Sequence, residues 1–157
     1  MSIFPTKILL ATDGSREAQL AAQTAADLSQ KTHSEVHVVH VFGITPIGPP
    51  VYPEGTGFHL VEYEVETELR QQISERRARE VLDAEVEKIR SFGGTVAEGH
   101  LIEGRVAPEI VALAEKIGAG LIVMGSRGLG GIRRALMGSV SDSVVRHAHC
   151  PVMVVRK

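Results

Sequence analysis

A glycine-rich segment in the last third of the chain has the residue types and spacing to bind an anion. Its first seven positions contain Gly125, Gly128, Gly130 and Gly131. Glycines let backbone amides approach a ligand without a Cβ in the way, and successive amides can form an anion-binding nest. The segment runs into an expected helix start at Ser139, where unpaired N–H groups favour negative charge. The pattern predicts a phosphate site over 125–139, with a purely structural turn as the alternative.

Hydroxyl and carboxyl groups follow at once in the first turn of that expected helix. We expect Ser139 to be the N-cap, with Asp142 three residues later completing a capping box. Ser141 and Ser143 add two further hydroxyls. If Ser139 caps the helix, its hydroxyl can reach a ligand only by leaving the cap.

The glycine segment does not match the common nucleoside triphosphate motifs. No Gly-Lys-Ser or Gly-Lys-Thr occurs in the chain, so there is no P-loop. Arg133 stands where a dinucleotide fingerprint starting at Gly128 needs its third glycine. Arg127, Arg133 and Arg134 could contact phosphates through their guanidinium groups.

A second candidate lies at the end of the first expected strand, 7–11. Asp13 follows that strand and would lie at the carboxyl edge of a sheet. Its carboxylate could accept a hydrogen bond from a ribose hydroxyl or help to hold a metal ion. It could equally cap the following helix, a role for which Ser15 competes. The sequence leaves both roles open.

The histidines and the single cysteine suggest no metal centre. His147, His149 and Cys150 crowd into four residues without a second cluster, which does not suit structural zinc. His37 and His40 would point to opposite faces of a strand, and neither has an evident partner. No nucleophile elbow or catalytic triad can be recognised from spacing. We therefore predict no metal-ligating and no catalytic residue.

Strands and helices are expected to alternate along the whole chain. Short apolar runs bounded by turn residues indicate strands over 7–11, 36–42, 95–102, 121–124 and 151–155. Helical patterns fill 17–30, 60–92, 106–117 and 139–149. This alternation predicts an α/β fold with a parallel sheet and helices on both faces. Ligands bind such sheets beyond the carboxyl ends of the strands, where the strand order reverses.

Two segments of this pattern are unusual. Eight of the fifteen residues in 43–57 are Gly or Pro, so we expect a flexible loop over 43–59. The expected helix 60–92 is heavily charged, which indicates a solvated face. It also carries apolar residues at roughly helical spacing: Leu69, Ile73, Val81, Leu82, Val86 and Ile89.

Composition limits the possible functions. The 157 residues suit a single domain over 1–157, and 43% hydrophobic with 23% charged residues are ordinary for a globular protein. A net charge of −2, two Tyr and no Trp argue against general nucleic-acid binding. No apolar run is long enough to span a membrane. The single cysteine suits the cytoplasm, which is where we expect the protein.

Gly125, Gly128, Gly138 and Ser139 match the spacing Gly-x2-Gly-x9-Gly-Ser. With this motif the sequence resembles the nucleotide-binding branch of the universal stress protein family. The resemblance extends over 7–15, which ends in Asp-Gly-Ser, over His40-Val41, and over 139–156. It is weakest over 43–68.

The resemblance implies a single-domain, five-stranded parallel sheet of order 3-2-1-4-5, similar to adenine-nucleotide alpha-hydrolases, that binds ATP with Mg²⁺ or Mn²⁺. By this resemblance, the motif residues would hold the ribose and phosphates, and Asp13 would lie near the ribose and metal ion. The remaining implied contacts are Val140 and Ser141 beside the phosphates, and Ala11, Val41 and Met124 around the adenine. The resemblance also implies a homodimer through the closing strand 151–155.

The expected function is therefore an ATP-binding stress-response or signalling module. We expect at most slow ATP hydrolysis, because no base or water-positioning group is evident. Two alternatives stay open: a dimeric interaction protein that needs no nucleotide, and a sensor of AMP or cyclic AMP. An adenylate-forming enzyme is disfavoured, because such enzymes carry a Ser-Gly-Gly-type loop where this chain has Asp13-Gly14-Ser15.

Overall fold

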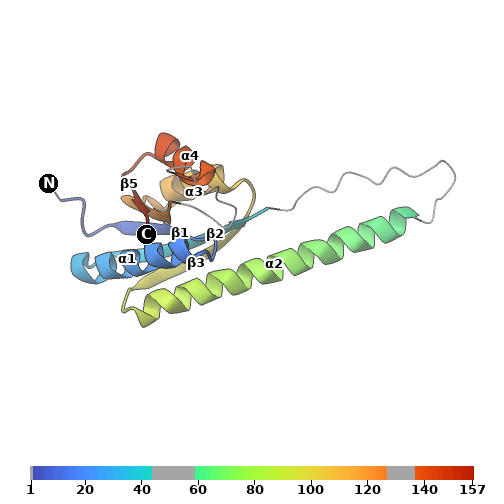
Figure 1. Cartoon of the computed structure of the whole chain (residues 1–157), viewed down its shortest axis with the longest axis horizontal. Helices are drawn as coiled ribbons and strands as arrows, with labels where there is room; N and C mark the ends of the chain where they lie inside the picture. Colours follow the sequence, from blue (N-terminus) through green and yellow to red (C-terminus); the bar gives the residue numbers. More distant parts are fainter. Residues whose placement is uncertain (1, 44–58, 127–136) are drawn as a thin grey trace.

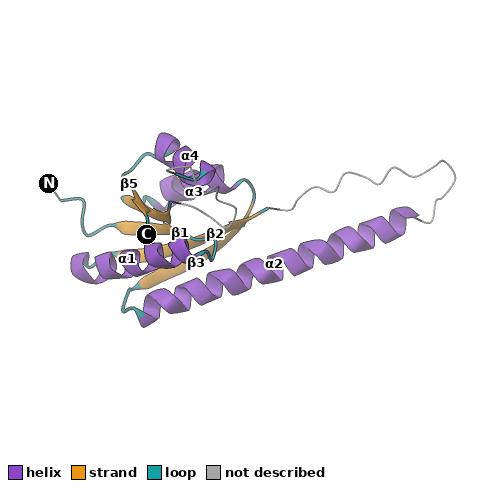
Figure 2. Cartoon of the chain, in the orientation of Figure 1, coloured by secondary structure: helices purple, strands orange, loops and turns teal. Residues whose placement is uncertain are grey.

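Strands and helices alternate from one end of the chain to the other (Figure 1, Figure 2). The computed structural model describes residues 2–43, 59–126 and 137–157. The strands are β1 (Lys7–Ala11), β2 (Glu35–Phe42), β3 (Val96–Glu103), β4 (Leu121–Gly125) and β5 (Val152–Val155). The helices are α1 (Arg16–Thr32), α2 (His59–Ser91), α3 (Val106–Ile117) and α4 (Ser139–His147). The predicted elements are confirmed, with ends that differ by no more than two residues.

The five strands form one parallel sheet in the order β3-β2-β1-β4-β5. Strand β1 is central, and its last residue Ala11 pairs with Val39 of β2 on one side and Met124 of β4 on the other. The expected fold class and strand order are confirmed. The continuous apolar runs of β1 and β4 follow from this position, because central strands of a parallel sheet are buried on both faces.

Helices cover both faces of the sheet and create two apolar cores (Figure 2). Alternate side chains of β1 serve different cores, as the two-residue repeat of a strand requires. Ile8 and Leu10 pack in the core that contains the alanines of α1 and the C-terminal part of α2. Leu9 and Ala11 pack in the core that contains α3 and α4.

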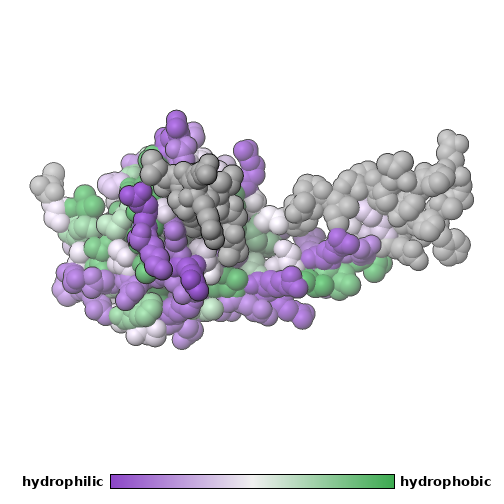
Figure 3. All heavy atoms as spheres, in the orientation of Figure 1, coloured by the Kyte–Doolittle hydropathy of each residue, from purple (hydrophilic) through white to green (hydrophobic). Residues whose placement is uncertain are grey.

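Helix α2 packs on the sheet through only part of its length. Leu82 and Ile89 are buried in the first core, whereas Leu69 and Ile73 are 55% and 44% exposed. Figure 1 shows the N-terminal part of α2 extending past the sheet, and Figure 3 shows hydrophobic side chains on its surface there. The predicted apolar stripe therefore reaches the core only at its C-terminal end.

Most of the predicted flexible loop, residues 44–58, lies outside the described residues. Within the part of the chain that the structure describes, no helix is both long enough and apolar enough to cross a membrane.

Candidate functional site

The carboxyl ends of β1 and β4 lie side by side at the point where the strand order reverses. The chain leaves β1 toward β2 on one side and leaves β4 toward β5 on the other. Parallel sheets of this kind bind ligands at such a point. The three residues expected around an adenine, Ala11, Val41 and Met124, are buried and belong to the same core on the α3 and α4 face. The structure thus gathers them from three adjacent strands.

The turn after β1 shows which of the two candidate residues, Asp13 or Ser15, caps α1. Ser15 is the N-cap, because its Oγ accepts the N–H of Ala18 at 3.2 Å. Asp13 instead accepts the N–H of Ser15 through Oδ1 at 2.9 Å, so its carboxylate shapes the turn. Gly14 between them has a φ of +77°, a conformation that residues with a Cβ adopt at a cost. Asp13 is half-buried at the carboxyl edge, as expected.

His40 holds this turn against β2, a role that sequence reasoning missed. Its Nδ1–H donates to the backbone oxygen of Thr12 at 2.8 Å, while the N–H of Thr12 donates to the oxygen of Val39 at 3.0 Å. Hydrogen bonds therefore hold both the N–H and the C=O of Thr12, the residue that precedes Asp13. Strand alternation showed that His40 and His37 face opposite sides, but only the register between β1 and β2 reveals the partner of His40.

Gly125 ends β4 at a point of close backbone approach. A Cβ at this position would lie 2.9 Å from the carbonyl carbon of Glu17 and 3.1 Å from the backbone nitrogen of Ala18. The glycine thus lets the first turn of α1 pack against β4. This is a structural reason for the first glycine of the motif, in addition to the amide contact expected from the sequence.

Ser126 links three elements at the exit of β4. Its N–H donates to the oxygen of Val155 at 2.9 Å, and its hydroxyl donates to the carboxylate of Glu17. Its backbone oxygen accepts the N–H of Gly138 at 2.6 Å and the hydroxyl of Ser141 at 2.9 Å. The end of β4 and the start of α4 are therefore joined directly.

The predicted cap of α4 is wrong. Gly138 is the N-cap residue, Ser139 is already helical, and no side chain caps the helix. The capping box also fails, because Ser139 is not the N-cap residue. The carboxylate of Asp142 accepts the Nε–H of Arg146 at 2.9 Å. The physical cause is tertiary: the oxygen of Ser126 holds the turn one residue earlier than local pattern suggests. The exposed Ser139 hydroxyl is therefore not needed for capping.

Several sequence-predicted residues meet at this edge and two cannot be placed. Gly138, Ser139 and the half-buried Val140 form the start of α4, next to the buried Ser141. The first N–H groups of a helix lack partners within the helix and favour anions. The other two predicted residues, Arg127 and Gly128, lie outside the described residues.

The comparison with known families agrees with this architecture. A family model described as the Universal stress protein family matches residues 5–156. This chain belongs to that family. A universal stress protein of Methanocaldococcus jannaschii is 36% identical over 152 residues, which cover 96% of this chain and 82% of that protein.

Solved structures of universal stress proteins share the fold. The universal stress protein UspA from Lactobacillus plantarum superimposes with a TM-score of 0.80 at 20% identity, covering 99% of this chain and 100% of that one. A universal stress protein from Archaeoglobus fulgidus, solved in complex with dAMP, gives a TM-score of 0.63 at 25% identity. That comparison covers 98% of this chain and 100% of the other.

Proposed function

We propose that this universal stress protein binds an adenine nucleotide at the carboxyl edge between β1 and β4, with ATP and Mg²⁺ or Mn²⁺ as the expected ligand. The proposal rests on one arrangement. The buried Ala11, Val41 and Met124 lie beside the Asp13 turn and the start of α4, which supply polar groups for a ribose and phosphates. The dAMP complex of the Archaeoglobus fulgidus relative supports the choice of an adenine nucleotide.

The phosphates would bind at the start of α4. Charge-assisted hydrogen bonds to backbone N–H groups are worth about 1.5–3 kcal/mol each, so three or four would support micromolar affinity after association costs. The Asp13 carboxylate would take the ribose or the metal ion. Backbone amides do not distinguish a triphosphate from a monophosphate, so AMP and cyclic AMP remain the alternative ligands.

We also propose that the protein acts in the cytoplasm as a homodimer joined through 151–155. Strand β5 is the edge of the sheet and pairs only with β4 among the described strands. An apolar edge strand offers unpaired backbone groups to a second copy. Met153 on this strand is partly exposed. We expect Met153→Lys to convert the dimer to a monomer in light scattering, and a wild-type monomer would refute this arrangement.

The first test of the nucleotide site is mass spectrometry of small molecules released by denaturing freshly purified protein. Calorimetric titration with ATP and Mg²⁺, AMP or cyclic AMP then ranks the ligands. We expect ATP to be released, or to bind with a micromolar Kd. If no nucleotide is released and none of the three binds, the glycine segment is a structural turn and the nucleotide-independent alternative holds.

A matched pair of variants then tests the location of the site. Gly138 has a φ of −71°, which any residue can adopt, so Gly138→Val should fold normally while its side chain blocks the start of α4. Thr67→Val, on the exposed part of α2, is the control. Unchanged affinity in a natively folded Gly138→Val variant would place the ligand elsewhere.

A further inference from the structure

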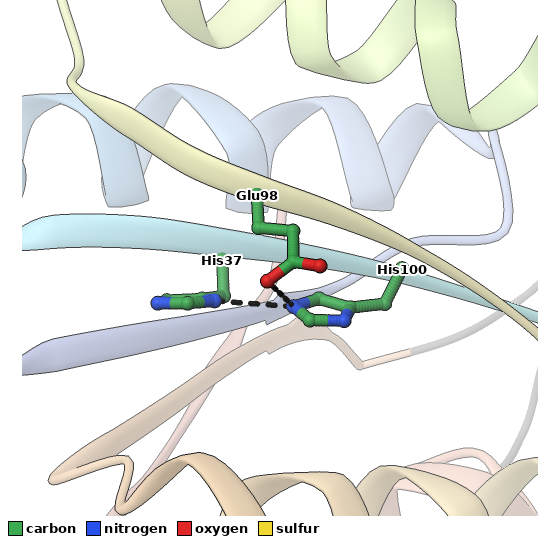
Figure 4. Close-up of side chains that lie close together, drawn as sticks. All are labelled: His37, Glu98 and His100. Carbon is green, nitrogen blue, oxygen red and sulfur yellow. Dashed lines mark hydrogen bonds and ion pairs between the residues drawn. The ribbon is translucent and has the colours of Figure 1, made fainter.

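Three potential metal ligands converge on the sheet face that α3 covers (Figure 4). His37 comes from β2, and Glu98 and His100 come from β3. One ligand atom from each residue lies within 4.8 Å of the other two. The sequence predicted no metal site, and the nucleotide site proposed above uses none of these residues.

A β-bulge creates this convergence. Val36 pairs with Val96, but the register then shifts, so that His37 pairs with Glu98 and Val39 with His100. The extra residue places the Glu98 and His100 side chains on the face of His37, which is the face of Val39. Bulges commonly re-aim side chains at functional sites. Without the shift, the partner of His37 would be Ala97, which has no ligating group.

The spacing of the ligand atoms suits a small tetrahedral ion. Nδ1 of His37 lies 3.1 Å from Nε2 of His100, and that nitrogen lies 3.8 Å from Oε2 of Glu98. Zinc binds nitrogen and carboxylate oxygen at about 2.0–2.2 Å in tetrahedral geometry, which separates neighbouring ligand atoms by about 3.3–3.6 Å. The two measured distances lie on either side of this range. The third pair, between His37 and Glu98, lies within 4.8 Å, and a rotation of the exposed Glu98 side chain would bring its carboxylate closer to His37.

The other ring nitrogen of His37 is already oriented. Its Nε2 lies 3.4 Å from Oε1 of Glu35, while the His37 side chain is buried. Histidines that bind metals commonly direct their second nitrogen to a carboxylate, which fixes the tautomer and strengthens the ligand. With the proton on Nε2, the Nδ1 lone pair of His37 points toward His100. Glu35 therefore prepares His37 to bind a cation.

The surroundings of His100 favour its neutral imidazole, the form that metals bind. Burial lowers the pKa of His100 below its ordinary value, and the charges of His37 and Lys116 lower it further. Glu98 acts in the opposite direction. Lys116, in the last turn of α3, opposes a bound cation, while the carboxylates of Glu98 and Glu35 favour one.

We propose that His37, Glu98 and His100 form a binding site for a divalent transition-metal ion, with Zn²⁺ as the best-fitting occupant. Two imidazoles and one carboxylate suit zinc, whereas Mg²⁺ and Ca²⁺ prefer all-oxygen sites. Glu98 is largely exposed, so solvent can reach the ion and water can occupy the fourth position. The site is distinct from the Mg²⁺ or Mn²⁺ that would accompany a nucleotide.

The test is a zinc titration of the metal-free protein in competition with a chromophoric chelator. We expect wild-type protein to bind one Zn²⁺ per chain. Both His100→Gln and Glu98→Gln should weaken binding by more than about 100-fold, because losing even a residue that only orients a ligand costs about 10–100-fold. Glu98 is 65% exposed, so its substitution removes a ligand without disturbing the core. His149→Gln, which changes an exposed histidine outside the cluster, is the control.

Two further measurements make the result specific. Co²⁺ substituted for Zn²⁺ should give the intense visible absorption of tetrahedral coordination, and His37→Gln should abolish it. Nucleotide affinity, where present, should stay unchanged in Glu98→Gln. The proposal is overturned if wild-type protein binds no stoichiometric zinc, or if zinc binding survives both Glu98→Gln and His100→Gln; a loss in His149→Gln would then locate the zinc outside the cluster.

Discussion

The hydroxyl of Ser141 donates to the backbone oxygen of Ser126 at 2.9 Å, which ties the first turn of α4 to the residue that follows β4. The same oxygen accepts the N–H of Gly138, and the Ser141 hydroxyl also contacts the oxygen of Gly138 at 3.0 Å. The end of a strand, rather than a local cap, therefore determines where α4 begins.

We predict that Ser141→Ala lowers the free energy of unfolding by about 0.5–1.5 kcal/mol, the usual value of one hydrogen bond. The loss should be no larger, because neither acceptor is left without a hydrogen bond. The backbone oxygen of Ser126 still accepts the N–H of Gly138, and the backbone oxygen of Gly138 still accepts the N–H of Asp142. Urea denaturation measures the change. Ser139→Ala, in which no cap is lost, should change stability by less than about 0.5 kcal/mol. If Ser139→Ala lowered the free energy of unfolding more than Ser141→Ala, the result would instead support Ser139 as the N-cap of a capping box.

We predict that Gly125→Ala destabilises the protein by about 1–3 kcal/mol, since the added methyl group overpacks against the backbone of Glu17. Gly43→Ala is the matched control. The nearest atom to its added Cβ would be the oxygen of Gly104 at 3.6 Å, an ordinary contact. The midpoints of urea denaturation measure the difference in stability between the two variants, provided that the unfolding free energy depends on urea concentration with the same slope in both. Equal midpoints would contradict the close approach of α1 to β4.

We predict that Leu82→Ala and Leu69→Ala differ greatly although both lie on α2. Leu82 is 2% exposed, so its truncation should cost about 2–5 kcal/mol through lost burial and a cavity. Leu69 is exposed, so its truncation should cost less than about 0.5 kcal/mol. Thermal and urea unfolding provide the comparison. A large loss for Leu69→Ala would mean that the N-terminal part of α2 packs against something in solution.

We predict that Cys150 resists alkylation in the folded protein near pH 8. Burial raises the pKa of its thiol, and this outweighs the hydrogen bond from the Ile122 backbone, which lowers it. The folded state then holds the thiol proton more tightly than the unfolded state does. Stability from this group is therefore present below the ordinary thiol pKa of about 8.5 and is lost as pH rises above it.

Iodoacetamide labelling followed by mass spectrometry measures this reactivity. Labelling should be slow in buffer and fast in urea at the same pH. The difference in unfolding free energy between wild type and Cys150→Ala should shrink as pH rises through that range. Equal labelling rates in the folded and unfolded states would show that the thiol is accessible and not perturbed.

The fold was predictable because its signals are local and mutually consistent. The apolar run over 7–11 ends at a cluster of turn residues, and the run over 121–124 behaves in the same way, so both strands could be located without tertiary information. Alternation of strands and helices then restricts the topology to a parallel sheet. Helix α2 is the exception. Its apolar spacing predicts which face is hydrophobic, but not that the sheet is too short to cover Leu69 and Ile73.

The resemblance implied which residues would surround an adenine, and the expected strand order predicts that these residues meet. Ala11 ends β1, and Val41 and Met124 each lie one residue before the end of a neighbouring strand, so the expected strand order brings the three together. The cap of α4 was mispredicted because the oxygen of Ser126 competes from outside the helix. The histidine cluster was missed for a related reason, since the bulge after Val36 decides which residues of β3 face His37.

The contact between Ser126 and Glu17 spans 109 residues, so one wall of the candidate site is synthesised long after the other. While the chain is still emerging, β1 has β2 as a neighbour but its other edge stays unpaired until β4 arrives. Because β1 is an apolar strand, its unpaired edge can form backbone hydrogen bonds with other chains. Closing so long a loop also carries an entropic cost that only the assembled sheet offsets. The nascent protein therefore acquires its candidate site and a protected central strand in the same late step.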